Sequence, residues 1–460
     1  MKLALLITEK FIGKHSKWFL LTLTIIAISL LLQWKFTIFR PQNTLLEGMV
    51  GTYQEHDLPL EVTNLLSEGL VKVSDFDQME PNLASSWDIN NDATIFKFYL
   101  RDNIYWIDGS PIQASDLSFN IPDVEITTPD ERTIQFKLKE PYSPLPSLLT
   151  KPIFKKGTLI GIGPYSLNRI EKSRIFITKL TLTPKENNLP RLLIRFYPNE
   201  KVAIAGFNLG EVQTLMGMSN PDAVEKSHQV KNKQVGDLTK IVTILYSLED
   251  PILGNRSLRQ ALSFAAPRIE GEDIANNPYP TNSWAHDKDS KKYLSNIEEA
   301  QAALERAKSS LSEEQLKSDL TITTTPNLER VAQIVVEEWK KIGFDVKIRV
   351  ESGVPQHFQM LLITQSIPRD PDQYVLWHSS QIKTNLTKYS SARVDKDLED
   401  GRKIVKEEDR KVSYYDFQKT LLEDAPATFL YFPKYNLIYL RKVENLLDKV
   451  LPLQIKANQM

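Results

Sequence analysis

Cysteine is absent from this chain of 460 residues. Its absence excludes disulfide bonds, thiolate metal sites, cysteine nucleophiles and a lipid-modified cysteine near the N-terminus. A location outside the cytoplasm is not excluded, because a large hydrophobic core can stabilise such a protein alone. Hydrophobic residues make up 41% of the chain and charged residues 25%, which indicates an ordinary globular protein of two or three packed units.

A strong net charge is also lacking, since the formal value is −1. Without a broad basic field there is little to attract nucleic acid, and we expect no such partner. The GxSxG, Walker A and HExxH motifs of common catalytic sites are missing as well. We therefore expect no catalytic residues, no cofactor and no enzymatic activity. A carboxylate-dependent hydrolase is the distant alternative, because carboxylate pairs leave no local signature.

Sites for phosphate and metal are equally poorly supported. Gly161-Ile162-Gly163 is followed by Pro164, so no GxGxxG loop is completed and a turn is expected. The acidic stretch Ser74–Glu80 lacks the turn glycine and terminal glutamate of a calcium loop. The six histidines are scattered without metal-ligand spacing. We therefore predict no metal site.

One long apolar run stands near the N-terminus. Lys10, Lys14 and Lys17 precede the apolar stretch Trp18–Leu32, which continues less strictly to Phe39. With that continuation the run is long enough to span a membrane, and the preceding lysines favour a cytoplasmic N-terminus. Because no small-residue cleavage site follows, we prefer an uncleaved anchor over a signal peptide. The expected arrangement is a single-pass protein of the cytoplasmic membrane, with residues 1–40 as cytoplasmic N-terminus and anchor.

Periodicity changes along the rest of the chain. Residues 93–100 and 133–139 alternate apolar and polar side chains and predict strands. In the second half, Ser295 with Glu298 predicts a capped helix, and Asn327 is expected to cap another. A further helix is expected over 412–423, and the mixed pattern indicates an α/β fold.

Five stretches carry recognisable motifs, namely Ser67–Leu70 with Glu80–Asn120, Gly161–Leu167, Asn255–Ala265, Glu337–Gly343 and Asp370-Pro371-Asp372. Further motif residues follow at Asn385, Tyr389, Val394-Asp395 and Glu423–Pro426. In this order the stretches resemble one family, the extracytoplasmic solute-binding proteins of peptide-type ABC transporters, which bind dipeptides, oligopeptides or nickel. The resemblance spans nearly the whole chain after the apolar run.

The resemblance implies a two-lobed periplasmic-binding-protein-like fold of class II type behind an N-terminal transmembrane helix. Lobe one is expected to comprise 41–243 plus 425–460 and lobe two 244–424, with crossings near Tyr246 and Pro426. Lobe one is expected to be reduced, because Ile121-Pro122 directly follows the stretch after which the family has a helical insertion. The ligand is expected in the cleft between the lobes.

Two further departures from the family pattern concern the helix after Asn255 and the ligand. Ala266-Pro267-Arg268 replaces an Asp-Arg pair and is expected to shorten that helix. The resemblance implies an aspartate three residues before Asp370-Pro371 that pairs with a peptide's α-ammonium, but Ile367 stands there. Either another carboxylate meets the amine, or the ligand presents no free amine at that point.

Candidate ligand-binding residues cluster in the stretch 366–381. Asp370 and Asp372 are candidates for the missing carboxylate, or else shape a turn or cap a helix. Arg369 is expected to meet an anionic group or to be an ordinary surface arginine. For Trp106 and Trp377 the alternative is core packing. The full set of candidates is Tyr53, Trp106, Tyr246, Ile367, Arg369, Asp370, Asp372, Tyr374, Trp377 and His378.

These observations predict a membrane-anchored extracytoplasmic receptor. It is expected to be a monomer that binds a peptide or similar small solute and delivers it to an ABC transporter permease. The alternative is a surface scaffold, chaperone or sensor that keeps the fold but has a degenerate cleft, and Ile367 and the reduced lobe one motivate it.

Overall fold

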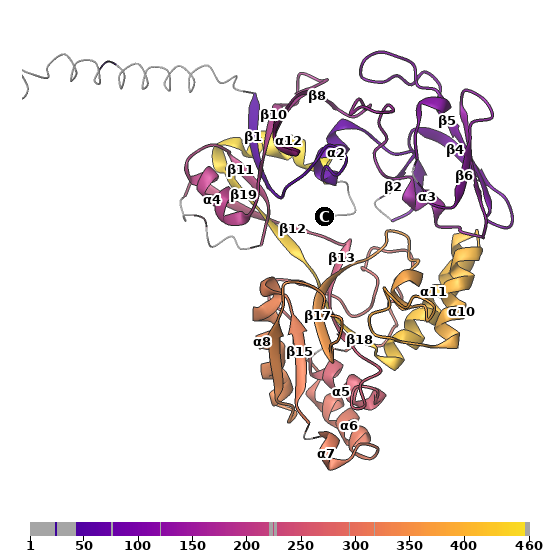
Figure 1. Cartoon of the computed structure of the whole chain (residues 1–460), viewed down its shortest axis with the longest axis vertical. Coiled ribbons are helices and arrows are strands. Elements are labelled where there is room, and N and C mark those ends of the chain that lie inside the picture. The colour runs from indigo at the N-terminus through magenta and orange to yellow at the C-terminus, as the bar shows by residue number, and fades with distance from the viewer. Residues whose placement is uncertain are drawn as a thin grey trace, which may run out of the picture.

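A computed structural model describes residues 24 and 43–455, except 75–76, 120, 220–223, 225–227, 294 and 317. The predicted membrane anchor lies outside the described residues apart from Thr24. None of the helices within the described part has the combination of length and apolar character required to cross a membrane. Figure 1 shows two lobes, with the sheets of lobe one above and the sheet of lobe two below.

Lobe one is built on a seven-stranded sheet and a four-stranded sheet. The larger sheet has the order β12 (Val230–Gly236), β19 (Lys434–Leu440), β11 (Thr214–Met218), β1 (Thr44–Val50), β10 (Arg191–Tyr197), β9 (Phe176–Pro184) and β8 (Tyr165–Ser173). Strand β1 pairs in parallel with both β10 and β11. The helices of this part are α2 (Leu60–Leu66), α4 (Glu200–Asn208) and α12 (Glu444–Gln454), which follows the 3₁₀ turn η4 (Arg441–Val443).

The four-stranded sheet contains both strands predicted from alternation. Its order is β4 (Ala84–Ile89), β5 (Ile95–Leu100), β7 (Thr133–Leu138) and β6 (Val124–Thr127), beside the pair β2 (Val71–Val73) and β3 (Met79–Pro81) and the helix α3 (Leu145–Leu148). Phe96 and Phe98 point into its core, as their spacing predicts. The 3₁₀ turn η1 (Ala114–Asp116) precedes β6, and the Asp116 carboxylate accepts a hydrogen bond from the Gln113 backbone at 2.9 Å.

Lobe two is a six-stranded mixed sheet covered by helices. Its order is β14 (Asp273–Ile274), β18 (Ala427–Phe432), β13 (Lys240–Tyr246), β17 (Met360–Ser366), β15 (Leu320–Thr324) and β16 (Val346–Val350). The helical elements are α5 (Arg256–Ala265), α6 (Ile297–Lys308), α7 (Glu313–Leu316), η3 (Pro326–Leu328), α8 (Glu329–Lys340), α9 (Tyr374–Trp377), α10 (Ala392–Lys403) and α11 (Glu407–Asp424).

Two predicted helix caps are wrong by one or two residues. Helix α6 is capped by Asn296, whose side chain accepts from the Glu299 backbone, whereas Ser295 has a left-handed φ of 54°. Asn327 lies inside η3 and accepts a hydrogen bond from the Thr325 hydroxyl, so α8 begins beyond it. At α6 the neighbouring Asn296 takes the cap, and at α8 the turn η3 comes first, which spacing alone does not resolve.

The chain crosses between the lobes twice, at adjacent points. Residues 237–239 join β12 to β13, and Pro433 joins β18 to β19. The two crossings are bonded to each other, since the Asp237 backbone N–H donates to the Pro433 carbonyl at 2.9 Å. Strands β13 and β18 lie wholly in the lobe-two sheet. The crossings expected near Tyr246 and Pro426 are therefore corrected to 237–239 and Pro433.

Helix α5 carries a motif arginine that anchors the end of α11. The buried guanidinium of Arg259 donates to the backbone carbonyls of Ala425 at 3.0 Å and Asp424 at 2.6 Å. It also donates to the carbonyls of Leu253 and Gly254. Ala425 ends α11 in the left-handed conformation, with φ 47°. A single side chain thus satisfies carbonyls that a helix end otherwise leaves open.

Arg259→Met is expected to lower the free energy of unfolding by about 2 kcal/mol, because buried carbonyls lose charged donors. Urea denaturation measures this change. Arg256→Met is the matched control, since Arg256 is exposed and lies 3.5 Å from Asp424. Equal stability of the two variants would contradict the anchoring role.

Candidate functional site between the lobes

Two large cavities are lined by described residues of both lobes. The cavity beside the crossings, here the hinge cavity, has a volume of about 520 Å³. Its wall includes Met49, Tyr53, Glu61 and Met216 from lobe one, Asp237 at the crossing, and Lys240, Asn327 and Thr364 from lobe two. The second, here the rim cavity, has a volume of about 670 Å³. Its wall includes Leu60, Asn64, Lys72, Tyr142 and Lys151 from lobe one, and Ile367, Arg369, Asp372, Val375 and Arg402 from lobe two.

The cavities are parts of one cleft. Ser366 at the end of β17 lines both of them, and the consecutive residues Leu60 and Glu61 of α2 line one each. The hinge cavity lies where the parallel strands β1 and β11 end. This is the position at which α/β sheets commonly bind ligands. Each volume falls within the usual range of small-molecule sites.

The lobes also touch at the rim opposite the crossings. The Ser143 backbone N–H donates to the Arg402 carbonyl at 2.7 Å, and the Arg402 guanidinium lies 5.0 Å from the centre of the Tyr142 ring. Farther along, the Gln78 amide donates to Glu407 at 2.9 Å. Figure 1 shows the small sheet of lobe one approaching α10 at this point. The rim cavity therefore has lobe one on one side and lobe two on the other, and these contacts join the two lobes at its outer edge.

Ile367 and Arg369, two of the candidate residues, line this cleft. Ile367 is buried, lines the rim cavity, and donates its backbone N–H to the Thr239 carbonyl at 2.9 Å. Arg369 lines the same cavity and is half-buried. Burial lowers its pKa, and the charges of Asp77 and Asp237 oppose that shift.

Asp370 and Asp372 line the rim cavity, but both carboxylates are already engaged. Asp370 forms a two-pronged ion pair with Arg410, with N–O distances of 2.9 and 2.5 Å. Asp372 accepts from the Arg402 Nε at 2.9 Å and from the Tyr374 backbone. Burial raises the pKa of Asp372, and Arg402 opposes the shift. These contacts match the structural alternative considered for both residues.

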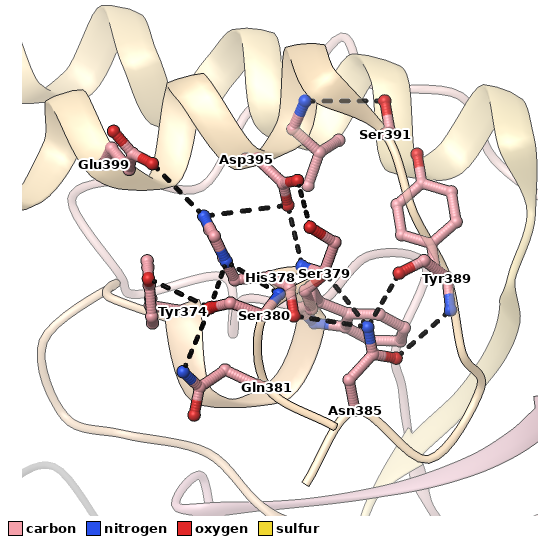
Figure 2. A network of polar contacts seen from close by, with 12 residues as sticks. Tyr374, His378, Ser379, Ser380, Gln381, Asn385, Tyr389, Ser391, Asp395 and Glu399 are labelled. Atoms are coloured by element: carbon pink, nitrogen blue, oxygen red, sulfur yellow. Dashed lines mark hydrogen bonds and ion pairs between the residues drawn. The ribbon is translucent and has the colours of Figure 1, made fainter. Parts of the chain in front are cut away.

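Tyr374, Trp377 and His378 belong to a polar network inside lobe two, and none of them lines either cavity. Figure 2 shows the His378 ring between Tyr374, on which it stacks at 4.0 Å, and the carboxylates of Asp395 and Glu399. Its Nδ1 accepts from the Ser380 backbone at 3.1 Å. Trp377 is buried and donates its Nε1–H to Gln373 at 2.8 Å.

The same network explains the other motif residues of this stretch. The Asn385 amide donates to the Tyr389 carbonyl at 2.7 Å (Figure 2). The Tyr389 hydroxyl donates to Asp424 at 2.6 Å. Asp395 accepts from the Ser379 backbone at 2.8 Å. These contacts hold the loop after α9 against α10 and α11. The motif from Asp370 onward therefore builds the wall behind the cleft.

Tyr53 lines the hinge cavity, whereas Trp106 and Tyr246 do not line either cavity. Trp106 is buried in the core of the four-stranded sheet. Tyr246 is fully buried in lobe two, with its hydroxyl 2.7 Å from the Thr428 hydroxyl. Tyr246 is the last residue of β13, a central strand paired with β17 and β18, and its side chain belongs to the lobe-two core. These two placements are corrections of the sequence prediction.

Several residues that line the cleft were not among the candidates predicted from the sequence. In α2, Val62, Leu65 and Leu66 are buried, whereas Leu60 and Asn64 are four residues apart and line the rim cavity. This helical periodicity is the signal by which the face could have been found. Lys72, Tyr142, Lys151 and Arg402 carry no such signal, because separate segments bring them together.

Asp77 reaches lobe two from the turn between β2 and β3. It lies beside Arg369, Ser283 and Pro280 in a small interlobe pocket. Burial raises the pKa of Asp77 to about 7, while a hydrogen bond from Ser283 and the charge of Arg369 oppose the shift. Near neutral pH this carboxyl is therefore only partly ionised and only partly balances Arg369. In the described part of the chain, no group of three or more His, Asp or Glu side chains is arranged to hold a metal ion.

Comparison with known proteins identifies the class. A family model described as bacterial extracellular solute-binding proteins, family 5 middle, matches residues 78–124 and 120–385, more than half of the chain. The chain belongs to this family. Family 5 proteins are binding proteins, so this solute-binding protein is not an enzyme.

Relatives and solved structures agree with the two-lobed fold. The probable D,D-dipeptide-binding periplasmic protein DdpA of Escherichia coli is 23% identical and aligns over 80% of this chain and 81% of its own. The oligopeptide-binding protein AppA of Bacillus subtilis is 26% identical, over 61% of this chain and 58% of its own. NikZ of Campylobacter jejuni, solved with Ni(L-His), has a TM-score of 0.67 at 22% identity and covers 87% of this chain and 94% of its own. The predicted α/β two-lobed periplasmic-binding-protein-like fold is thus confirmed.

Proposed function

We propose that this solute-binding protein captures a short peptide, or a similar small solute, between its lobes outside the cytoplasm and delivers it to an ABC transporter permease. The observation that carries the proposal is the cleft itself, two adjoining cavities whose walls come from both lobes. Relatives named as dipeptide- and oligopeptide-binding proteins support a peptide as ligand. A receptor of this kind encloses its ligand when its lobes close about the crossings.

The N-terminal apolar run would tether the receptor to the cytoplasmic membrane. Trp18–Leu32 with its continuation is long enough for one span, and the preceding lysines favour a cytoplasmic N-terminus. Such a tether would hold the monomer close to its permease. It would replace the lipid anchor that a cysteine-free chain cannot carry.

A scaffold or sensor with a degenerate cleft is the second candidate. It is favoured by Ile367, an apolar residue in the cleft wall, and by the engagement of Asp370 and Asp372 with arginines. Under this alternative the lobes would not close on a small solute.

Native mass spectrometry of the full-length chain tests the proposal. A pool of tripeptides with free termini, at micromolar concentration, is expected to give one added peptide mass per chain. Small-angle scattering of the same mixture is expected to show a smaller radius of gyration than the chain without peptide. An unchanged mass together with an unchanged radius would favour the scaffold or sensor.

A further inference from the structure

The rim cavity carries positive charge that the protein does not neutralise by ion pairing. Of its four basic residues, Arg402 is paired with Asp372 at 2.9 Å and Lys72 lies 3.3 Å from Glu80. The other carboxylate of the wall, Asp370, is committed to Arg410. Among the described residues, neither Arg369 nor Lys151 has an ion-pair partner. Arg369 therefore has the charges of Asp77 and Asp237 nearby but no ion pair, and both cationic groups can pair with a ligand.

The hinge cavity has the opposite character. Its two lysines are paired, Lys240 with Asp237 at 3.0 Å and Lys434 with Asp273 at 2.6 Å. Glu61 lines the same cavity and has no ion-pair partner in the described part of the chain. Burial raises the pKa of Glu61, and the nearby charge of Lys240 only partly offsets that shift. One carboxylate therefore remains available at this end of the cleft.

We propose that the cleft binds a zwitterionic solute in one orientation, with its cationic group at Glu61 in the hinge cavity and its anionic group at Arg369 and Lys151 in the rim cavity. For a peptide with free termini, the α-ammonium lies at the hinge and the α-carboxylate at the rim. This inference rests on the proposed function, because it assigns the ends of a ligand bound in that same cleft.

The energetics favour this orientation over the reverse. A half-buried guanidinium would repel an ammonium group, whereas it can hold a carboxylate with two parallel hydrogen bonds. Ile367, two residues before Arg369, adds apolar surface and no charge to the rim cavity. The orientation is therefore opposite to that implied by an aspartate at position 367. It also places a positive charge at Glu61, whose neighbour Lys240 is itself paired with Asp237.

Three forms of one tripeptide pool test the orientation, namely free, N-acetylated and C-amidated. Binding to the full-length chain is titrated by native mass spectrometry. Each blocked pool is expected to bind the wild-type chain about 10- to 100-fold more weakly than the free pool, as the loss of a charged hydrogen bond predicts. Glu61→Gln is expected to abolish the penalty of N-acetylation and keep that of amidation. Arg369→Gln is expected to do the reverse.

Controls and contrary outcomes separate the two proposals. Glu140→Gln and Lys156→Gln remove exposed charges outside the cleft and are expected to leave both penalties unchanged. If Arg369→Gln abolished the N-acetylation penalty instead, the orientation would be reversed and the inference wrong. If all three pools bound the wild-type chain equally, the proposed recognition of the peptide's charged ends would be wrong, whereas the proposed peptide binding would be supported. If no pool bound, the proposed peptide function would fail, and this inference with it.

Discussion

Asp370→Ala is expected to lower the free energy of unfolding by about 3–5 kcal/mol, the cost of breaking a buried ion pair by removing one partner. The Arg410 guanidinium is buried, and Asp370 supplies both carboxylate oxygens to it at 2.9 and 2.5 Å. The Arg410 Nε donates to the Gly401 carbonyl. This hydrogen bond holds the side chain in place, so the guanidinium cannot turn outward to be solvated. The variant would therefore leave an unpaired charge between α10 and α11. Denaturation in urea measures the loss.

A double-mutant cycle separates the pair from its surroundings. The double variant Asp370→Ala with Arg410→Met removes both charges of the pair. Its free energy of unfolding is therefore expected to fall by less than the sum of the decreases in the two single variants. Asp400→Ala is the control, because Lys396 and Asp400 form an exposed pair on α10, worth about 0.5 kcal/mol or less. An Asp370→Ala variant with wild-type stability and lost peptide binding would make Asp370 a ligand residue.

Glu47→Gln is expected to stabilise the protein, in contrast to Asp370→Ala. We expect it to raise the free energy of unfolding at pH 8 by about 3 kcal/mol. Glu47 lies on β1, is fully buried, and accepts from the Gln454 amide at 2.9 Å on both oxygens. Burial raises its pKa from 4.5 to about 7, opposed by that hydrogen bond and reinforced by Glu61. Each unit of pKa shift corresponds to about 1.4 kcal/mol, and the amide introduced by E47Q needs no deprotonation.

The sign of the pH dependence follows from the raised pKa. The folded chain holds a proton on Glu47 that the unfolded chain releases above pH 4.5, so this stabilisation is complete below pH 4.5 and is lost as the pH rises through 7. In the E47Q variant the free energy of unfolding is expected not to show this loss as the pH rises. Melting temperatures of both chains between pH 4 and pH 8 measure it. Glu125→Gln, at an exposed pair with Lys137, is the control, and a decline of equal size in wild type and E47Q would contradict the assignment.

Much of the fold was predictable because it depends on patterns short in sequence. The alternation at Phe96 and Phe98 predicts a half-buried strand, since strand side chains point to opposite faces regardless of what lies beyond. The order of the family motifs likewise predicts two lobes and a ligand between them. Errors remained where neighbours compete for one role, as Ser295 and Asn296 do at the start of α6.

The sequence by itself determined the absence of cysteine chemistry, the α/β class and the family, because composition, periodicity and motif order are local or additive properties. Only the tertiary structure decided which charges serve the fold and which remain for a ligand. Asp370 and Arg369 are adjacent in sequence, yet Asp370 meets Arg410, forty residues further along the chain, whereas Arg369 faces the cleft. Ion pairing depends on distances between segments far apart in sequence, so the sequence alone does not show which charges folding leaves unpaired.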